Sequence, residues 1–235
     1  MDYELPGLSI VLPAHNEEAG IERAVTNAAA FAGAHAGKYE IIVVDDGSTD
    51  GTAACLRALR SDFSELKVLT NETNEGYGAA LVRGFRAAEY EWVFTTDSDN
   101  QFDINELAYF LPYTGGCDFL MGYRKNRQDS FTRKFLAWGF NLLVDWVFRV
   151  NVKDVDCAFK LIRRSVLQKM VLTSRDFFID TEIIARARRM GCRIYQRAVS
   201  HYPRTAGETT IRPSNIPRTL REMVRIYREL GRTRK

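Results

Sequence analysis

The stretch Val93–Phe102, VFTTDSDNQF, carries the clearest information about fold and site in this chain. Its first residues are apolar or β-favouring and predict a buried strand, which turns polar at Asp97. Alternate side chains of an extended segment point to the same side, so we expect Asp97, Asp99 and Gln101 to converge at the carboxyl end of the strand. Two carboxylates and an amide oxygen suit Mg²⁺ or Mn²⁺, ions that commonly share their coordination shell with substrate phosphates. The stretch predicts a metal–diphosphate site. The alternative is an acidic turn, because Asp is favoured in turns and Asp-x-Asp recurs by chance.

The composition is that of a globular protein with one sizeable domain. The chain has 235 residues, of which 46% are hydrophobic and 27% charged, and its net charge of +3 does not mark it as a polyanion binder. The four cysteines form no C-x-x-C pair, which argues against a zinc site or disulfide framework and favours a reducing compartment. No stretch resembles a signal peptide or approaches the roughly 20 apolar residues that span a bilayer. We therefore expect a cytoplasmic protein.

Three strand–loop–helix units precede the acidic stretch. Strands are predicted at residues 8–12, 39–44 and 66–69, and the helices that follow them at 19–32, 52–59 and 79–88. This alternation is typical of βαβ units and predicts an α/β fold with a mostly parallel, Rossmann-like central sheet flanked by helices. Polar residues gather after the strands, at His15–Glu17, Asp45–Ser48 and Asp97–Gln101. Because the carboxyl ends of parallel strands meet at one edge, these three loops are expected to build one crevice.

The loop Asp45-Asp46-Gly47-Ser48 argues against two common nucleotide enzymes. It contains neither G-x-G-x-x-G nor a Walker lysine motif, so a dinucleotide oxidoreductase and a P-loop enzyme are disfavoured. An acidic residue after a strand can instead accept hydrogen bonds from a base or a ribose hydroxyl. A helix-capping cluster is the alternative, but two adjacent carboxylates are more than a cap needs.

Several segments, in this order and spacing, resemble family 2 glycosyltransferases of the GT-A fold: LSIVLPAHNEEAGIE, YEIIVVDDGSTDGT, NEGYGAALVRGF and FTTDSDNQF. The later segments GYRKNR, DVDCAFKLIRR and HYPRTAG are similar to the dolichyl- and polyprenyl-phosphate sugar transferase branch, and the resemblance covers about residues 7–215. It implies an inverting, metal-dependent enzyme that moves a hexose of mannose or glucose type from a GDP- or UDP-sugar to a polyprenyl or dolichyl phosphate. The chain departs from the branch at Phe102-Asp103-Ile104, where His-Pro-Pro or Asn-Pro-Pro is usual.

The resemblance also implies roles for individual residues. The nucleotide-sugar set is Pro13, His15, Asn16, Glu17, Asp45, Asp46, Asp97, Ser98 and Arg204. The metal set, for Mg²⁺ or Mn²⁺, is Asp97, Asp99 and Gln101, and the catalytic set is Asp99, Arg124 and Arg204. The sugar and acceptor set is Arg124, Arg127, Arg133, Asp154, Asp156, Asp180 and Glu182. Arg124 follows a strand and suits bidentate phosphate binding, with a solvated basic loop as the alternative. For Asp180 and Glu182 the alternative is the capping of a helix.

Two stretches of the C-terminal half predict contact with a membrane surface. Residues 131–150 include the almost wholly apolar KFLAWGFNLLVDWVFRV, with Trp138 and Trp146 near its two ends. This helix is too short to cross a bilayer and fits the membrane interface, with packing on the core or a partner as the alternative. Residues 216–235 form a basic amphipathic helix, which we separate from a GT-A catalytic domain of residues 1–215. Its cationic stripe fits anionic lipid, with a solvated face as the alternative: Arg218, Arg221, Arg225, Arg228 and Arg232.

Three functions remain open from the sequence. The first is sugar transfer to a polyprenyl or dolichyl phosphate at the cytoplasmic face of a membrane, where an anionic acceptor attacks without a strong protein base. The second keeps the donor but uses a soluble hydroxyl acceptor, a saccharide or natural product, and needs a base for which Asp156, Asp180 and Glu182 compete. The third is a non-catalytic nucleotide-sugar-binding subunit. The expected partners are the donor, the lipid acceptor and an anionic membrane surface. A membrane-embedded subunit stays open, and no nucleic acid is expected, since no RNA-binding motif occurs.

Overall fold

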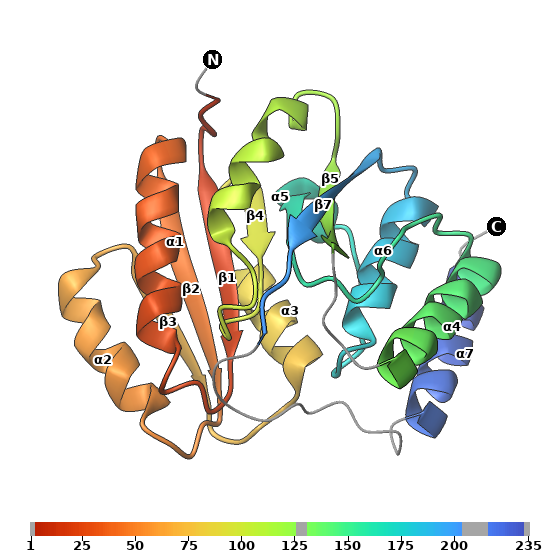
Figure 1. The fold of residues 1–235 in the computed structure, drawn as a ribbon, viewed down its shortest axis with the longest axis horizontal. Coiled ribbons are helices and arrows are strands. Elements are labelled where there is room, and N and C mark those ends of the chain that lie inside the picture. The colour runs from red at the N-terminus through yellow and green to blue at the C-terminus, as the bar shows by residue number, and fades with distance from the viewer. Residues whose placement is uncertain (1–2, 126–130, 204–215, 233–235) are drawn as a thin grey trace.

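A seven-stranded sheet forms the centre of the described part of the protein, and helices cover both of its faces (Figure 1). The structure is a computed structural model that describes residues 3–125, 131–203 and 216–232. The strands are β1 (Leu8–Ala14), β2 (Tyr39–Asp46), β3 (Leu66–Asn71), β4 (Trp92–Thr95), β5 (Phe119–Lys125), β6 (Lys160–Arg163) and β7 (Ile194–Ser200). They stand in the order β3-β2-β1-β4-β6-β5-β7.

The sheet is parallel except at β6. β1 pairs in parallel with β2 along its whole length and with β4 on its other side, while β6 runs antiparallel between β4 and β5. The predicted mostly parallel sheet is confirmed, but its one reversed strand was not foreseen. The chain proceeds from β1 outward to β3 and then returns to β4 on the opposite side of β1. This reversal of strand order makes the carboxyl ends of β1 and β4 the expected place for a ligand.

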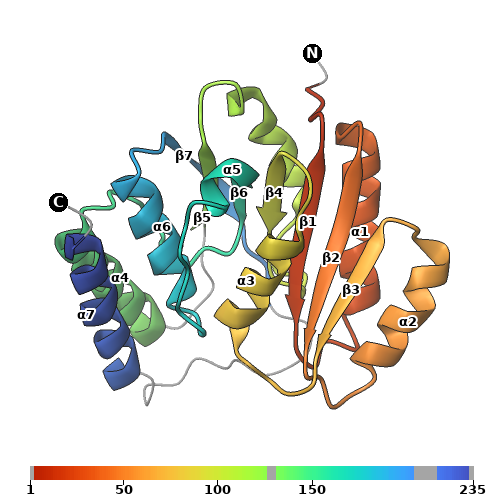
Figure 2. The same ribbon diagram turned by 180° about the vertical axis from the view of Figure 1, so that it is seen from behind.

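The two faces of the sheet carry separate apolar cores. The helices and 3₁₀ turns are α1 (Ile21–His35), α2 (Thr52–Asp62), α3 (Tyr77–Ala87), η1 (Ile104–Tyr109), η2 (Leu111–Tyr113), α4 (Phe131–Phe148), α5 (Arg164–Leu167), α6 (Ile179–Arg189) and α7 (Ile216–Arg232). Along β2, Ile41 and Val43 pack with α1 and α2, whereas Ile42 and Val44 pack with α3 on the other face. Figure 1 looks onto the face with α1 and α2, and Figure 2 onto the face with α3.

The first helix begins later than its sequence suggests. α1 starts at Ile21 rather than at residue 19, and its N-cap is Gly20, which makes no side-chain capping bond. Asn16, a good capping residue type, lies instead in the left-handed region with a φ of 57°. Its side chain accepts a hydrogen bond from the backbone N–H of Thr49 at 2.8 Å. Asn16 therefore joins two loops instead of starting a helix.

α4 and α7 lie side by side at the end of the sheet near β5 and β7, as both ribbon views show (Figures 1 and 2). The ring of Phe148 on α4 lies 6.4 Å from the ring of Tyr227 on α7, and Arg186 on α6 forms a 2.8 Å ion pair with Glu229 on α7. α7 is thus fastened to the sheet through α6. Among the described helices, none has the length and apolar character required to cross a membrane.

Candidate active site

The loops after β1 and β2 are fastened to each other. His15 Nδ1 lies 2.8 Å from the carbonyl oxygen of Asp46, and because a carbonyl only accepts, Nδ1 carries the proton. The backbone N–H of Glu17 donates to Thr52 Oγ1 at 2.9 Å, and that of Asn16 donates to Ser48 Oγ at 3.0 Å. The nucleotide-binding residues predicted in these two loops are therefore brought together. Pro13, in the same set, lies within β1 and is buried.

The acidic pair at the end of β2 supports the neighbouring backbone. The Asp46 carboxylate accepts hydrogen bonds from Asn71 Nδ2 at 2.7 Å and from the N–H groups of Glu75 and Gly76 at 2.9 Å. Asp45 accepts one from the N–H of Ser48 at 3.1 Å. Both residues are almost fully buried, with 1% and 3% of their surface exposed. This supporting role was not foreseen, and the expected contact of Asp46 with a base or ribose stays a prediction.

The acidic stretch after β4 is a turn rather than an extended segment. β4 ends at Thr95, and Asn100 has a φ of 58°, so the alternation expected for Asp97 to Gln101 does not apply. The turn is fastened to the first unit, because Ser98 Oγ donates to the carbonyl of Pro13 at 2.8 Å and Asn100 Nδ2 donates to that of Gly20 at 2.9 Å. Ser98 is buried, and its predicted role in binding the nucleotide sugar stays a prediction.

Asp97, Asp99 and Gln101 nevertheless occupy neighbouring positions in that turn. Asp99 Oδ1 accepts a hydrogen bond from the N–H of Gln101 at 3.1 Å, and Gln101 Nε2 donates to the carbonyl of Tyr202 at 2.8 Å. Because its amide nitrogen is used in this way, Gln101 can offer its side-chain oxygen to a cation. Burial and the charge of Asp99 raise the pKa of Asp97 to about 7, against a hydrogen bond from Tyr77 that lowers it. The pKa shift is evidence that the two carboxylates lie close together.

A second group of charged side chains comes from the end of β5, the loop before β6, β6 itself and α6. Arg124 at the end of β5 forms a bidentate pair with Asp154, its Nε and Nη2 each 2.7 Å from a carboxylate oxygen. Lys160 on β6 is fully buried and places its ammonium group 2.6 Å from Asp180 Oδ1. Both pairs join side chains that are buried for most of their surface. Arg124, expected to bind phosphate, is thus held by a carboxylate of the predicted sugar and acceptor set.

Asp156 differs from its neighbours because part of its carboxylate is unsatisfied. Its Oδ1 atom is buried and has no hydrogen-bond partner among the described residues. Burial and the charge of Asp154 raise the pKa of Asp156 to about 7, although the positive charge of Arg124 opposes the shift. A carboxyl group with a pKa near neutrality exchanges a proton readily at physiological pH.

These side chains form one cluster, which we call the strand-end cluster, because the charge of each carboxyl acts on its neighbours. Its members are Asp97, Asp99, Asp154, Asp156, Asp180, Arg124 and Lys160. Among the described residues, its carboxyl groups lie with two cations, Arg124 and Lys160, which pair with Asp154 and Asp180. Asp97, Asp99 and Gln101 offer two carboxylates and an amide oxygen, a set of hard oxygen donors that fits a divalent cation. No three His, Cys, Asp or Glu side chains converge as a complete metal site in the described ranges, so phosphate oxygens of a donor would complete the shell.

Comparison with known proteins identifies the family. Residues 9–171, more than half of the chain, match the family described as glycosyl transferase family 2. The chain belongs to glycosyl transferase family 2. It is 31% identical over 219 residues to a dodecaprenyl-phosphate galacturonate synthase of Rhizobium johnstonii, an alignment covering 91% of this chain and 63% of that protein.

Two other comparisons agree with this family 2 assignment. The chain is 31% identical to an undecaprenyl-phosphate 4-deoxy-4-formamido-L-arabinose transferase of Aeromonas hydrophila, over 86% of this chain and 62% of that protein. It thus spans a little over three fifths of the length of these curated relatives. Glucosyl-3-phosphoglycerate synthase of Mycobacterium tuberculosis, solved with uridine diphosphate, superposes with a TM-score of 0.69 at 21% identity, over 96% of this chain and 80% of that one. The predicted α/β GT-A fold is confirmed by this likeness.

Not all predicted site residues of this family 2 chain lie at the strand-end cluster. The Glu182 carboxylate accepts hydrogen bonds from the N–H groups of Thr173 and Ser174 and pairs with Arg186, so it anchors a loop, and its place in the sugar and acceptor set stays a prediction. Arg127 and Arg204 lie outside the described residues, as does the side chain of Arg133.

Sequence reasoning missed two members of the site. Lys160 is a lone charged residue in the apolar run Phe159–Ile162, a pattern that signals a buried, paired lysine. Tyr77 donates a hydrogen bond to Asp97 from the first turn of α3, and nothing in its local sequence indicates this contact.

Proposed function

We propose that this chain is the catalytic part of a metal-dependent glycosyltransferase that passes a sugar from a nucleoside-diphosphate sugar to a polyprenyl phosphate. The observation that carries the proposal is the strand-end cluster, in which Asp97 and Asp99 follow β4 beside the carboxyl end of β1. The acceptor is supported by the polyprenyl phosphates in the names of the two relatives. The donor is supported by the family and by the uridine diphosphate in the structural neighbour's site.

The chemistry needs charge neutralisation on the departing diphosphate. A bound Mg²⁺ or Mn²⁺ on Asp97, Asp99 and Gln101 supplies that neutralisation. The chain's own residues orient the donor: the fastened loops after β1 and β2 receive the nucleoside, and the turn at Ser98 fixes the distance between them and the metal ligands. The acceptor phosphate is already an anion, so it attacks the anomeric carbon in line and inverts it without a strong protein base.

A neutral hexose suits the crevice better than a uronic acid. Arg124 and Lys160, its two buried cations among the described residues, are paired with Asp154 and Asp180. A sugar carboxylate next to these acids would meet like charge, which costs several kcal/mol in a poorly solvated site. We therefore propose that the transferred sugar is of mannose or glucose type, although one relative is named for galacturonate.

A panel of GDP-mannose, UDP-glucose and UDP-galacturonate in a thermal-shift assay with Mn²⁺ tests this choice of sugar.

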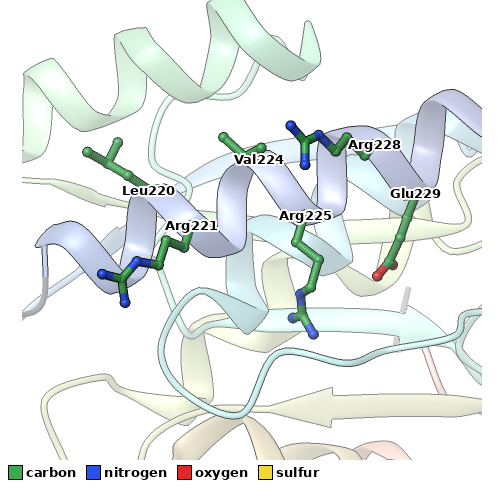
Figure 3. A pocket seen from close by; sticks show the side chains of 6 residues that line it. All are labelled: Leu220, Arg221, Val224, Arg225, Arg228 and Glu229. Atoms are coloured by element: carbon green, nitrogen blue, oxygen red, sulfur yellow. The ribbon is translucent and has the colours of Figure 1, made fainter.

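The location we propose is the cytoplasmic face of a membrane with anionic lipid. α4 exposes an apolar stripe of Trp138, Leu142 and Trp146, with 60%, 58% and 79% of each residue accessible. On α7 the exposed apolar residues are Leu220, Val224 and Tyr227, next to Arg221 and Arg228. A pocket of about 650 Å³ lies along this helix and not at the strand ends (Figure 3). Aromatic side chains beside arginines suit the interface of an anionic bilayer.

Replacing Asp99 tests the central assignment. The Asp99→Ala variant should lose nearly all Mn²⁺-dependent transfer from a radiolabelled donor to a polyprenyl phosphate, because one of two metal carboxylates is gone. Asp62→Ala, at the exposed end of α2, removes the same charge far from the crevice and serves as the control. Circular dichroism checks that both variants fold. Unchanged turnover in the Asp99 variant would exclude the proposed metal site.

One observation favours a second candidate, transfer to a soluble hydroxyl acceptor. Such an acceptor needs a general base, and Asp156, with its pKa of about 7 and an unsatisfied oxygen, is suited to that role. Co-sedimentation with liposomes separates the two candidates. A protein that stays in the supernatant and glycosylates a free saccharide would support this second function over the first.

A further inference from the structure

A short loop segment before α6, Thr173–Asp176, is held by side chains of α7. We call it the connecting segment. Arg218 Nη2 lies 2.6 Å from Asp176 Oδ2, and Ser174 Oγ donates to Glu222 Oε2 at 3.2 Å. These two contacts come from successive turns of α7, since residues four apart lie on the same helix face. Two side chains of α7 therefore contact the connecting segment, and Arg218 remains largely exposed while doing so.

A third contact reaches the same segment through α6. Glu229 on α7 pairs with Arg186 at 2.8 Å, and Arg186 pairs with Glu182 at 2.7 Å. Glu182, which is fully buried, accepts hydrogen bonds from the N–H groups of Thr173 at 3.1 Å and Ser174 at 2.8 Å. A buried carboxylate that is satisfied by backbone N–H groups holds them firmly, because losing it would leave them unpaired.

The other side of the connecting segment presses on the start of α3. The N–H of Ala79 donates to the carbonyl of Arg175 at 3.1 Å. A Cβ atom placed on Gly76 would lie 2.6 Å from the Arg175 carbonyl oxygen, and one on Gly78 would lie 2.5 Å from that of Ser174. Gly76 also has a φ of 103°, which disfavours any other residue. Backbone thus lies directly against backbone at this point.

The start of α3 in turn contacts the strand-end cluster. Tyr77, between the two glycines, donates a hydrogen bond to Asp97. From the opposite side the Asp46 carboxylate accepts hydrogen bonds from the N–H groups of Glu75 and Gly76, both at 2.9 Å. A displacement of the connecting segment would therefore move Tyr77 and, through its hydrogen bond, the carboxylate of Asp97.

The two sides of α7 have different chemistry. Figure 3 shows Arg221, Arg225 and Glu229 on one side of the helix, and Leu220, Val224 and Arg228 on the other. Arg225 pairs with Glu222, so the first side faces the bonds described above. Leu220 and Val224 are about half exposed, and Arg228 is exposed beside them. One side of the helix therefore carries exposed apolar residues and Arg228, whereas Glu222, Arg225 and Glu229 take part in ion pairs.

We propose that α7 couples contact with an anionic membrane surface to the metal site, through the connecting segment and the start of α3. The inference rests on the proposed function, because it takes the bilayer as the occupant of the outer face and Asp97 as a metal ligand. Binding to the bilayer fixes α7, and its three contacts then hold the connecting segment against Gly76 and Gly78. Tyr77 is a positioning residue in this scheme, acting through Asp97.

Hydrogen exchange of backbone amides tests the coupling without any metal. Vesicles of phosphatidylglycerol and phosphatidylcholine are added to the full chain, and exchange is followed at residues 75–79 and 173–176. We expect about fivefold slower exchange on vesicle binding, the lower range of typical allosteric coupling. The Glu222→Ala/Glu229→Ala variant should bind vesicles at least as well, because it loses two negative charges, yet show no slowing at residues 75–79.

The control is Glu22→Ala/Asp62→Ala, which removes the same charge from α1 and α2 and should behave as the parent does. Mn²⁺ affinity in the absence of vesicles, measured by the electron paramagnetic resonance of free Mn²⁺, should fall several-fold in the Glu222/Glu229 variant only. Vesicle binding with unchanged exchange at 75–79, or equal slowing in that variant, would overturn the coupling and leave the proposed function intact. A chain that turns over donor but never binds vesicles would sink both the membrane location and the coupling.

Discussion

Asp156 shows how a single buried carboxyl group makes stability depend on pH. In the folded chain its pKa is raised to about 7, mainly by burial, from an ordinary value near 4. The folded state therefore keeps a proton between about pH 4 and pH 7 that the unfolded chain has released. Stability from this group is complete below about pH 4 and is lost as the pH rises through 7, with a slope of up to about 1.4 kcal/mol per pH unit.

The Asp156→Asn variant cannot release that proton, so its free energy of unfolding should decrease less between pH 4.5 and 7 than that of the parent. Urea denaturation at four pH values across this range measures the difference. Asp62→Asn on the surface of α2 is the matched control and should keep the parent's slope. Parallel curves for the parent and the Asp156 variant would show that this carboxyl group titrates normally.

At the level of single residues, the sequence predicts which residue types lie at the site better than it predicts which side chains form ion pairs. It indicates that Asp97 follows a strand, and the structure brings Asp97 into one cluster with Asp154 and Asp180, which only the family resemblance had placed near it. It does not indicate that Asp154 closes on Arg124, which lies 30 positions earlier in the chain. Such a pair depends on which strands become neighbours, and no local pattern of residues contains that information.

The elements were predictable wherever one periodicity dominates. β2 is apolar at successive positions because both of its faces are buried, and its predicted bounds agree with the structure to within two residues. β6 is only four residues long and runs antiparallel, so neither its length nor the βαβ alternation indicates its direction. The sequence predicts an extended segment after β4, but the structure has a turn there, because Asn100 adopts a positive φ that its residue type permits but does not require.

The connecting segment lies so close to the start of α3 that replacing Gly78 there should destabilise the protein. Gly→Ala inside a helix ordinarily stabilises a protein by about 1 kcal/mol. At Gly78 the added methyl group would lie 2.5 Å from the carbonyl oxygen of Ser174, which is backbone and cannot rotate away. We expect Gly78→Ala to lower the free energy of unfolding by about 1–3 kcal/mol, as overpacking does.

Gly139 on α4 is the matched control, because a Cβ atom there would meet no atom within 4 Å. Gly139→Ala should raise the free energy of unfolding by about 0.5–1 kcal/mol, opposite in sign to the change at Gly78. Urea unfolding midpoints at a constant slope give both values. A stabilised Gly78 variant would mean that the connecting segment does not press on α3.

At the scale of the whole molecule, charge is separated between the two ends of the sheet. The strand-end cluster gathers acids at the crevice, whereas α7 exposes Arg221 and Arg228 at the far edge, beside α4 (Figures 1 and 2). The net charge of +3 conceals this separation, since it adds two regions of opposite sign. An anionic bilayer would attract the α7 end, which orients the molecule as well as binding it.

Neutralising the two exposed arginines tests this orientation. Each arginine near an anionic surface contributes about 1 kcal/mol, so Arg221→Gln/Arg228→Gln should weaken vesicle binding by about 30-fold at low salt. The difference between variant and parent should shrink at 0.5 M salt, where exposed charges are screened.

Trp146→Ala should weaken vesicle binding at both salt concentrations, because the contribution of a buried indole ring is not screened by salt. Sedimentation with phosphatidylglycerol vesicles measures all three, and equal binding by the arginine variant and the parent at low salt would move the membrane contact away from α7.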